Sequence, residues 1–470
     1  MLSTINSVLK AIDDFVWSIP LIVLILAVGI FLTIRLKGLQ FTKLGSAFKH
    51  MFKNESSGEH GEVSSFAALC TALSATIGTG NIVGVATAIV AGGPGALFWM
   101  WIAALLGIAT KYSECLLAVK YRVVAEDGHI VGGPFYYIEK GMGKNWKWLA
   151  KIFAFFGVGV GLFGIGTFTQ INGITSAVNN FFDPSNAWTV EILGRSYSWT
   201  VIIAGLLLTL CVALVIIGGL KRISQVAQII VPFMAITYVL AALIIIFMNI
   251  TSVPAAIVEI VQSAFGMRAV AGGALGAMIV AMQKGIARGI FSNEAGLGSA
   301  PIAAAAATVA EPAKQGLVSM LGTFIDTIVI CTMTGLAIVI TGTWDDGLEG
   351  VAVTTKAFQM GLPFPYQVAS FILMICLVFF AFTTILGWDY YSEKCLEYLS
   401  GGNQKLVKGY RWVYILAIFI GPFMTVSAVW TIADIFNGLM AIPNLIALVA
   451  LNGVVVAETK IYLDSLKKQK

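Results

Sequence analysis

The chain has 470 residues, of which 58% are hydrophobic and only 11% are charged. This composition is typical of a protein that crosses a membrane many times, and it excludes a soluble enzyme or binding domain. The formal net charge of +5 comes from basic residues between the apolar runs, so it gives no support to a nucleic-acid partner.

Apolar runs long enough to cross a bilayer predict an all-α polytopic membrane protein with about eleven transmembrane helices. The runs lie near residues 16–34, 64–91, 96–119, 149–180, 199–219, 225–249, 269–298, 315–342, 366–393, 411–430 and 434–457. Asp13 and Asp14 stand where a signal peptide would carry basic residues, so we expect the first run to be retained as a span.

Basic residues in the loops predict the orientation of the chain, because cytoplasmic loops are enriched in lysine and arginine. The loop after the first span carries no acid until Glu55, and its basic residues are Arg35, Lys37, Lys43, Lys49 and Lys53. This loop is expected to be cytoplasmic. Counting spans from there places the N-terminus outside and the C-terminus inside a plasma membrane.

Cysteine and histidine are too scattered to predict a metal centre. The six cysteines and three histidines lack the spacing of zinc ligands. A phosphate-binding glycine loop and a Ser–His–Asp grouping are also not recognisable. We expect no organic cofactor, and the class we predict is a transporter rather than an enzyme.

The second apolar run contains a segment that predicts a broken helix. Between Ala75 and Asn81 the chain reads ATIGTGN, which places two glycines, two hydroxyls and an amide inside a span. Non-helical backbone at membrane depth is tolerated only where it is buried or lines a polar cavity. Its free N–H and C=O groups can hold anions and cations, as at the substrate sites of secondary transporters.

Two sequence blocks resemble the alanine or glycine:cation symporters. Residues 92–107 read GGPGALFWMWIAALLG, and residues 285–301 read GIARGIFSNEAGLGSAP. The resemblance covers essentially the whole chain. It implies a fold of the leucine-transporter (LeuT) type, in which two five-helix halves of opposite topology surround a site made by the first helix of each half.

The resemblance implies a division of the chain and a function. Residues 1–63 would form an extra helix and its basic loop, 64–250 and 251–457 the two five-helix repeats, and 458–470 a cytoplasmic tail. Helices 64–91 and 269–298 would carry the breaks. The implied function is sodium-coupled symport of alanine and glycine by alternating access. A proton-coupled amino-acid transporter using Asp326, and an uncoupled channel or amino-acid sensor, are the alternatives.

The end of the inner half-helix predicts a sodium site, because its freed carbonyls are oxygen ligands. Resemblance to the fold pairs these carbonyls with adjacent hydroxyls on a later helix. The predicted ligands are the carbonyls of Ser74 and Ile77 and the hydroxyls of Thr383 and Thr384. The alternative is that the threonines bond back to their own helix. Thr76 and Asn81 are candidate ligands of a second cation, together with Asp326.

The start of the outer half-helix predicts a substrate site. The amides of Thr79 and Gly80, beside Thr76 and Gly78, are suited to a carboxylate because N–H groups and the positive end of the helix dipole coincide there. Gln170 lies in an apolar span. Its amide either donates to the substrate carboxylate or joins two helices.

Two aromatic residues are predicted to limit the size of the substrate. Phe168 would cover its apolar side. Trp388, one turn after Thr384, would narrow the pocket to alanine or glycine. The alternative for Trp388 is a position in the aromatic belt at the membrane surface.

The helix at 269–298 departs from the glycine- and serine-rich break of the broader fold, because charges interrupt it. Met282 and Gln283 are predicted to lie near the substrate. Arg288, Asn293 and Glu294 are predicted to belong to a cytoplasmic gate. A salt bridge of little energetic value between Arg288 and Glu294 is the alternative.

Overall fold

The computed structural model describes residues 2–53, 61–125, 128–192, 195–267, 273–423 and 426–468. Some predicted features lie outside the described residues. These are Glu55, positions 269–272 and 424–425 of two predicted helices, and the last two residues of the tail.

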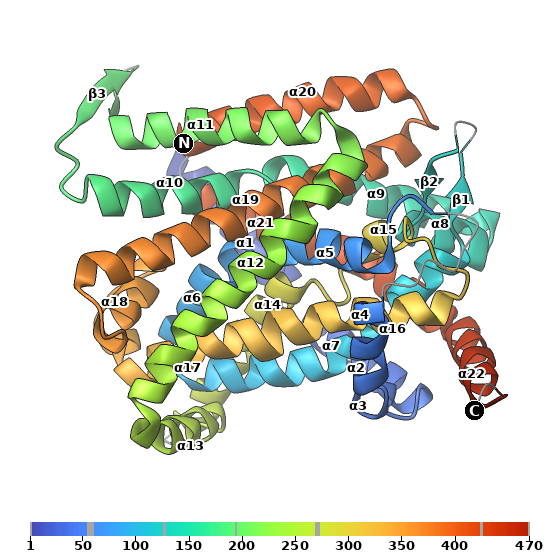
Figure 1. Ribbon diagram of the computed structural model, residues 1–470, viewed down its shortest axis with the longest axis horizontal. Helices are drawn as coiled ribbons and strands as arrows, with labels where there is room; N and C mark the ends of the chain where they lie inside the picture. Colours follow the sequence, from blue (N-terminus) through green and yellow to red (C-terminus); the bar gives the residue numbers. More distant parts are fainter. Residues whose placement is uncertain are drawn as a thin grey trace.

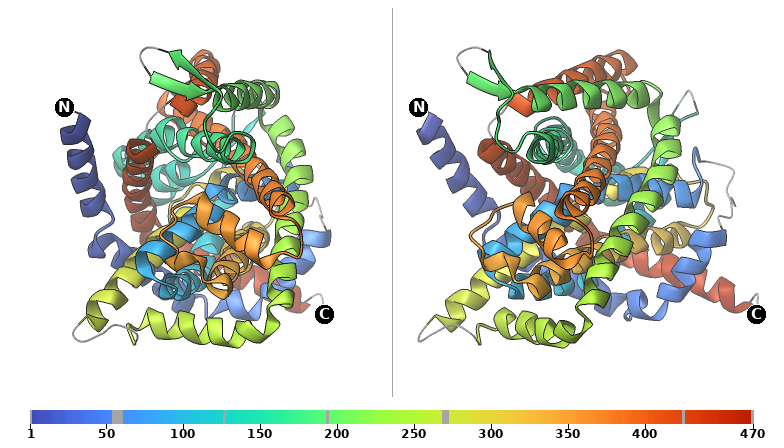
Figure 2. Two further views of the ribbon diagram at one scale, coloured as in Figure 1. Left: turned by 90° about the vertical axis from the view of Figure 1, so that its left-hand side faces the viewer. Right: turned by 60° about the vertical axis from the view of Figure 1, so that its left-hand side comes forward.

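Residues 2–53 form four helices, which are α1 (Leu2–Val16), α2 (Ile19–Arg35), α3 (Leu39–Thr42) and α4 (Leu44–Lys53). The predicted first span corresponds to α2, and α1 precedes it as a separate helix. Figure 2 shows α1 at the edge of the molecule, where it packs against α21.

The next part of the chain contains the first broken helix, which is formed by α5 (Ser65–Thr76), the π-helix η1 (Gly80–Gly84) and α6 (Val85–Gly92). Its other helices are α7 (Gly95–Lys120), α8 (Pro134–Tyr136), η2 (Tyr137–Met142), η3 (Lys144–Trp146), α9 (Lys147–Phe163), α10 (Phe168–Phe182), α11 (Trp199–Ile216) and α12 (Gly219–Met248). Two antiparallel hairpins pair β1 (Val123–Val124) with β2 (Ile130–Val131), and β3 (Thr189–Ile192) with β4 (Arg195–Ser198).

The remaining chain is again almost entirely helical. Its elements are η4 (Ile250–Ser252), α13 (Val253–Ala264), α14 (Ala274–Asn293), α15 (Ala300–Ala304), α16 (Pro312–Thr323), the π-helix η5 (Phe324–Cys331), α17 (Thr332–Thr341), η6 (Thr343–Asp345), α18 (Val351–Gly361), α19 (Tyr366–Leu399), α20 (Gln404–Ile420), η7 (Gly421–Phe423), α21 (Val426–Ala450) and α22 (Asn452–Lys468).

The prediction of an all-helical, multi-span protein is confirmed. Among the described residues, ten helices are long and apolar enough to cross a membrane, or eleven when the bent pair of α5 with η1 and α6 is counted as one span. Exposed leucines at positions 206, 207, 210 and 214 cover one side of α11. Such a side is suited to contact with lipid.

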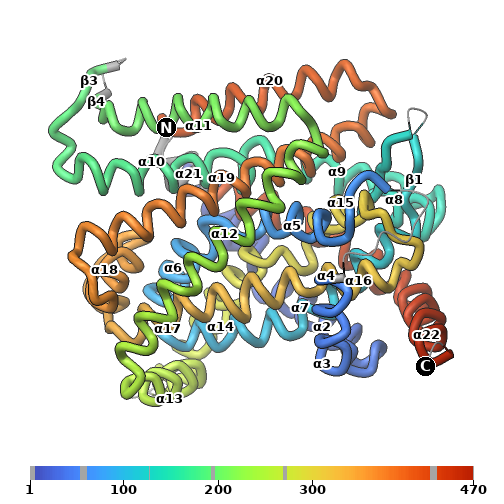
Figure 3. Tube along the Cα trace, in the orientation of Figure 1, coloured from blue at the N-terminus to red at the C-terminus, as the bar shows by residue number. Residues whose placement is uncertain are grey.

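The broken helix lies in the middle of this assembly. In Figure 1, α10, α11 and α20 lie along the top of the molecule, and α7, α13 and α17 lie in its lower part. Helix α12 crosses between these groups and packs on α5 and α19. Figure 3 follows the chain through the bend between α5 and α6, against which α14 packs.

One predicted span is interrupted where the sequence analysis expected a continuous helix. Residues 149–180 form α9 and α10, which are separated by Gly164–Thr167. A Cβ atom at Gly166 would lie 2.6 Å from the Gly161 carbonyl oxygen and 2.7 Å from the Trp388 Cβ. Glycine therefore lets this bend lie directly against α19.

Candidate functional site

The break in the first core helix is where the sequence predicts it. Helix α5 ends at Thr76, Ile77 has an extended backbone, and helical structure resumes at Gly80. The two half-helices are inclined by 54° to each other. Ile77, Thr79 and Asn81 are fully buried, so the freed backbone groups face protein rather than lipid.

Side-chain oxygens accept hydrogen bonds from the backbone amides that the break leaves free. The Gly78 N–H donates to Asn81 Oδ1 at 2.9 Å, and the Thr79 N–H donates to Gln170 Oε1 at 3.1 Å. Gln170 therefore lies at the break, but its oxygen stands where a substrate carboxylate oxygen was expected. A bound carboxylate would compete with this oxygen for the Thr79 amide.

The structure brings together two of the four predicted sodium ligands. Thr384 Oγ1 lies 3.2 Å from the Ile77 carbonyl oxygen, and it also donates to Phe380 at 3.0 Å. This contact joins α19 to the unwound end of α5. An oxygen pair of this kind, a free carbonyl and a hydroxyl, is suited to a sodium ion.

The other two predicted sodium ligands turn their side chains elsewhere. The Thr383 hydroxyl donates to carbonyls of its own helix at 3.0 and 3.1 Å, and its remaining neighbour is Met234 Sδ at 3.5 Å. The Ser74 hydroxyl donates to the Thr71 carbonyl at 2.7 Å. For Thr383 the bond back to its own helix, which was the alternative for the threonines, describes the geometry. The predicted ligand from Ser74 was its carbonyl, and the direction of its hydroxyl does not test that prediction.

A second group of polar side chains surrounds Asp326 on the other side of the break. One carboxylate oxygen accepts from Asn81 Nδ2 at 2.7 Å, and the other accepts from the hydroxyls of Ser292 and Thr327, each at 2.8 Å. The side chains come from η1, α14 and η5, and all are buried. The three donors are neutral, so they orient the carboxylate without cancelling its charge.

Thr76 does not join this group, although it was a candidate second-site ligand. Its hydroxyl donates to Ala72 and Leu73 of its own helix. The oxygen atoms gathered here come instead from Asp326, Ser292 and Thr327, whereas Asn81 turns its Nδ2 atom to Asp326 and its Oδ1 atom to the Gly78 N–H. Carboxylate and hydroxyl oxygens are ligands that hard cations prefer.

The break in the second core helix lies later than the sequence analysis placed it. Helix α14 ends at Asn293, and Glu294 has a left-handed backbone with φ of 55°. The helical residues nearest the first break are Phe291 and Ser292, because a Cβ atom at Gly80 would lie 3.4 Å from each of them.

Met282 and Gln283 are therefore not beside the break, which corrects their predicted position. They precede Ser292 by almost three turns of α14. Met282 and Gln283 were expected beside the substrate, in a stretch whose apolar pattern is interrupted by charged and polar residues. The helix in fact continues through them, because their side chains point to a polar cavity beside α1.

The salt bridge between Arg288 and Glu294, which was the alternative to a gate role, is not formed. Arg288 forms a bidentate ion pair with Asp434 of α21, with N–O distances of 3.1 and 3.2 Å. The buried Glu294 carboxylate accepts instead from Trp388 Nε1 at 2.8 Å and from the Ser299 hydroxyl. Residues six apart do not share a helix face, so the two charged groups contact different helices.

The two aromatic residues differ in their relation to the break. Trp388 is fully buried and contacts the end of α14 through Glu294, so it does not belong to a belt at the membrane surface. Phe168 packs with Leu162 and Ala417. It precedes Gln170 by two residues and so points about 200° away from it around α10.

Asn293 remains close to the second group of polar residues. Its Nδ2 atom donates to Thr327 Oγ1 at 3.0 Å, and its Oδ1 atom accepts from the Ala295 N–H at 2.9 Å. The side chain thus ends the helix and connects its end to η5. This position joins it to the Asp326 group.

Sequence analysis missed three buried polar residues that hold the loop after α14. Lys111 Nζ donates to the Glu294 carbonyl at 3.1 Å. Glu114 accepts from the Gly296 N–H at 3.0 Å and from Asn444 Nδ2 at 2.6 Å. The signal that could have revealed them is an oppositely charged pair, Lys111 and Glu114, three residues apart in an apolar helix.

Comparisons with known proteins agree with this architecture. A model of the sodium:alanine symporter family matches residues 2–470. The sodium/alanine symporter AgcS of Methanococcus maripaludis is 46% identical over 472 residues, with 98% of each chain covered. The probable sodium/glutamine symporter GlnT of Bacillus subtilis is 39% identical, with 97% of this chain and 91% of the relative covered.

A solved structure supports the fold. The crystal structure of MhsT in complex with L-phenylalanine has a TM-score of 0.59 to this chain at 14% identity, with 86% of this chain and 93% of that chain covered. The protein is thus a multi-pass membrane transporter with a LeuT-type fold. Within that class, the chain belongs to the sodium:alanine symporter family.

Proposed function

We propose that the chain is a secondary active transporter that couples sodium entry to the import of a small neutral amino acid, alanine or glycine, across the plasma membrane. Residues 64–250 and 251–457 act as the two five-helix repeats, and alternating access takes place around their broken helices. The N-terminus lies outside and the C-terminus inside, because the basic loops then face the cytoplasm.

The contact between Thr384 and Ile77 carries this proposal. A hydroxyl of α19 lies 3.2 Å from a carbonyl that the broken α5 has freed. A sodium ion bound between them would hold the two helices together, and its release would let them separate. The carbonyl of Ser74 and the hydroxyl of Thr383 complete the proposed site after a small rotation.

The substrate carboxylate is proposed to bind the amides of Thr79 and Gly80, with Gln170 turning its NH₂ group toward it. Phe291 lies against Gly80 and takes the role that was expected of Phe168. Trp388 closes the side toward the end of α14. The Asp326 group supplies a second cation site, in which Asp326 and Ser292 contribute oxygen ligands and Asn81 contributes its Oδ1 atom once its amide group has turned over.

Substrate size is tested by competition against labelled alanine in proteoliposomes. Bulky side chains are excluded by steric clash with a pocket of this kind. Glycine is expected to compete within about tenfold of alanine, and leucine is expected not to compete at millimolar concentration. Competition by glutamine equal to that by alanine would contradict the small-substrate assignment and point to a wider pocket.

A glycine variant tests the close approach of the two helices. A Cβ atom at Gly78 would lie 2.5 Å from Thr384 Oγ1 and 3.1 Å from Gln170 Oε1. Overpacking of this kind costs about 1–3 kcal/mol, so Gly78→Ala is expected to reduce sodium-driven alanine uptake at least about fivefold. Uptake is measured per amount of monodisperse protein. Gly409→Ala on α20 is the matched control, because a Cβ atom there meets nothing within 4 Å, and equal loss in both variants would contradict the expectation.

A further inference from the structure

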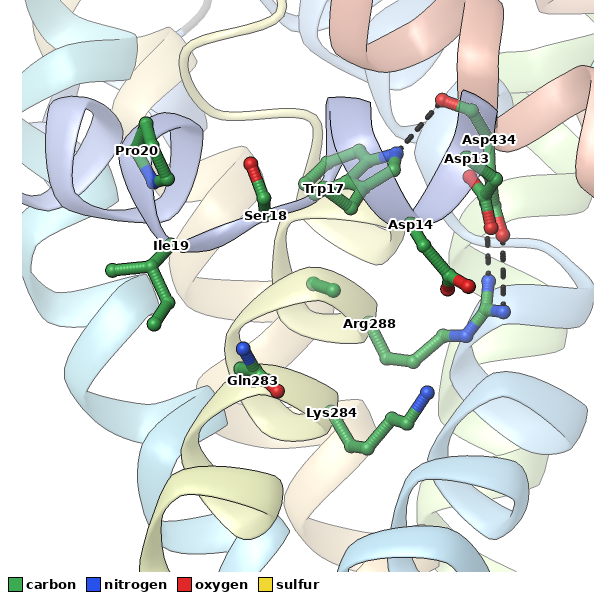
Figure 4. Close-up of a pocket in the computed structure, with 11 residues that line it drawn as sticks. Asp13, Asp14, Trp17, Ser18, Ile19, Pro20, Gln283, Lys284, Arg288 and Asp434 are labelled. Atoms are coloured by element: carbon green, nitrogen blue, oxygen red, sulfur yellow. Dashed lines mark hydrogen bonds and ion pairs between the residues drawn. The ribbon is translucent and has the colours of Figure 1, made fainter. Parts of the chain in front are cut away.

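A polar cavity of about 470 Å³ lies between α1, the connection from α1 to α2, α14 and α21. Figure 4 shows its charged side chains: Asp13, Asp14 and Asp434 on one side, and Lys284 and Arg288 below them. The helices α1 and α2 lie outside the two five-helix repeats. The transport site described above uses neither α1 nor Lys284.

The cavity contains an acid that needs a donor. Asp13 Oδ1 is buried, and no described residue donates a hydrogen bond to it. Asp434 already binds Arg288 through both of its oxygens. In Figure 4 the Asp14 carboxylate points toward Arg288, and the Lys284 ammonium lies on the same side. A buried polar group without a partner is costly, so a ligand that donates hydrogen bonds would be favoured beside Asp13.

Both signs of charge in one cavity select the class of ligand. A lone cation would be attracted to the carboxylates but repelled by Lys284 and Arg288. A lone anion would be attracted to these two bases but repelled by the carboxylates. A zwitterion satisfies both groups, with its ammonium at Asp13 and Asp14 and its carboxylate at the two bases. The volume lies within the range of small-molecule sites.

The cavity also shares a lining residue with a second cavity beside the outer half-helix. Arg288 lines this second cavity of about 510 Å³, together with Val83, Gly84 and Thr87 of η1 and α6. Arg288 therefore separates the cavity beside α1 from the cavity over the outer half-helix. A carboxylate that competes with Asp434 for Arg288 would loosen the contact between α14 and α21.

Helix α1 is fixed at this place by a specific bond. Trp17 Nε1 donates to the Asp434 carbonyl oxygen at 2.8 Å, and α1 packs along α21. Asp434 thus holds α1 through its carbonyl oxygen and α14 through its carboxylate. A movement of α21 that breaks the ion pair would also move α1.

We infer that this cavity is an entry site for a zwitterionic amino acid, in which Asp13 and Asp14 of α1 hold the ammonium while the carboxylate competes with Asp434 for Arg288. The inference rests on the proposed function, since it places the substrate one step before the break. It assigns to the N-terminal helix a role in capturing substrate.

The test has a readout that is independent of transport. Gln283→Cys, in a Cys211→Ser background, places a thiol in the wall of the cavity, and its rate of modification by a methanethiosulfonate reagent is measured in proteoliposomes. Alanine is expected to slow modification at least about fivefold (~1 kcal/mol), whereas acetate and ethylammonium at the same concentration are not. Protection should persist with Thr384→Val, which disables the proposed sodium site, and should disappear with the double change Asp13→Asn and Asp14→Asn.

The same double change is expected to raise the alanine concentration for half-maximal uptake at least about fivefold, with the maximal rate nearly unchanged. Lys10→Gln, on an exposed part of α1, is the matched control. Modification that alanine does not slow, in protein that still takes up alanine with sodium, would overturn the inference and leave the proposed function intact. Protection in protein that shows no sodium-driven uptake would support the site and instead refute the proposed function.

Discussion

Thr384→Val is expected to raise the sodium concentration for half-maximal alanine uptake at least about tenfold, equivalent to about 1.4 kcal/mol. Valine keeps the shape of threonine but removes the hydroxyl that lies 3.2 Å from the Ile77 carbonyl. The maximal rate at saturating sodium should be partly retained, because the amides of the break are untouched. The measurement is the initial rate of uptake as a function of sodium concentration.

Thr383→Val tests the second proposed hydroxyl of the sodium site, at the adjacent position. Its hydroxyl bonds to Phe379 and Phe380 of its own helix, so the sodium dependence should change less than in Thr384→Val. Equal shifts in both variants would mean that both hydroxyls turn to the ion during transport. An unchanged sodium dependence in both variants would contradict the proposed sodium site.

Asp326→Asn is expected to reduce alanine uptake below about 1% of the unmodified protein. The NH₂ group of asparagine would face at least one of the three donors that the carboxylate now accepts from, and the negative charge offered to a cation would be lost. A buried polar group left without a partner costs about 1–3 kcal/mol. The loss of a charged ligand adds to this cost.

Two measurements separate a role in transport from a role in folding. Thr327→Val removes one donor and keeps the charge, so it should retain at least about a tenth of the uptake (~1.4 kcal/mol). Sodium-dependent protection of Asp326→Asn against thermal aggregation should also be lost, whereas monodisperse protein is still recovered. Asp326→Asn protein that keeps sodium-dependent uptake would contradict a cation site at this position.

The first break was predictable because its cause is local. Gly78, Gly80 and the polar residues around them interrupt an apolar run, and membrane depth leaves few structures for such a segment. The span count was predictable for the same reason, since it depends on hydrophobic length alone. The division of 149–180 into α9 and α10 was not, because it depends on how closely Gly166 approaches Trp388.

The second break was misplaced because its residues have distant partners. Arg288 forms an ion pair with Asp434 on α21, which is far along the chain. This ion pair allows a charged residue inside a continuous helix. The actual end of α14 at Asn293 depends on Thr327 and on the buried residues Lys111 and Glu114 around the loop. The pattern of neighbouring residues in the sequence does not reveal these contacts, because the partners are far apart along the chain.

Side-chain direction was the third feature that sequence did not decide. Thr383 and Thr384 are adjacent, but only Thr384 faces the first break. Gln170 was correctly expected near a polar partner, yet the choice between substrate donor and helix contact depended on the position of Thr79. Such choices follow from the rotation of each helix about its axis, which neighbouring helices determine.

The central claim is sodium-coupled accumulation of alanine, and uptake by proteoliposomes tests it most directly. Labelled alanine is supplied with an inward sodium gradient, an equal potassium gradient or a proton gradient. The account predicts accumulation above equilibrium only with sodium, increased by a negative interior potential because one moved charge gains about 2.3 kcal/mol per 100 mV. Accumulation driven by protons without sodium, or equilibration without accumulation under every gradient, would contradict it.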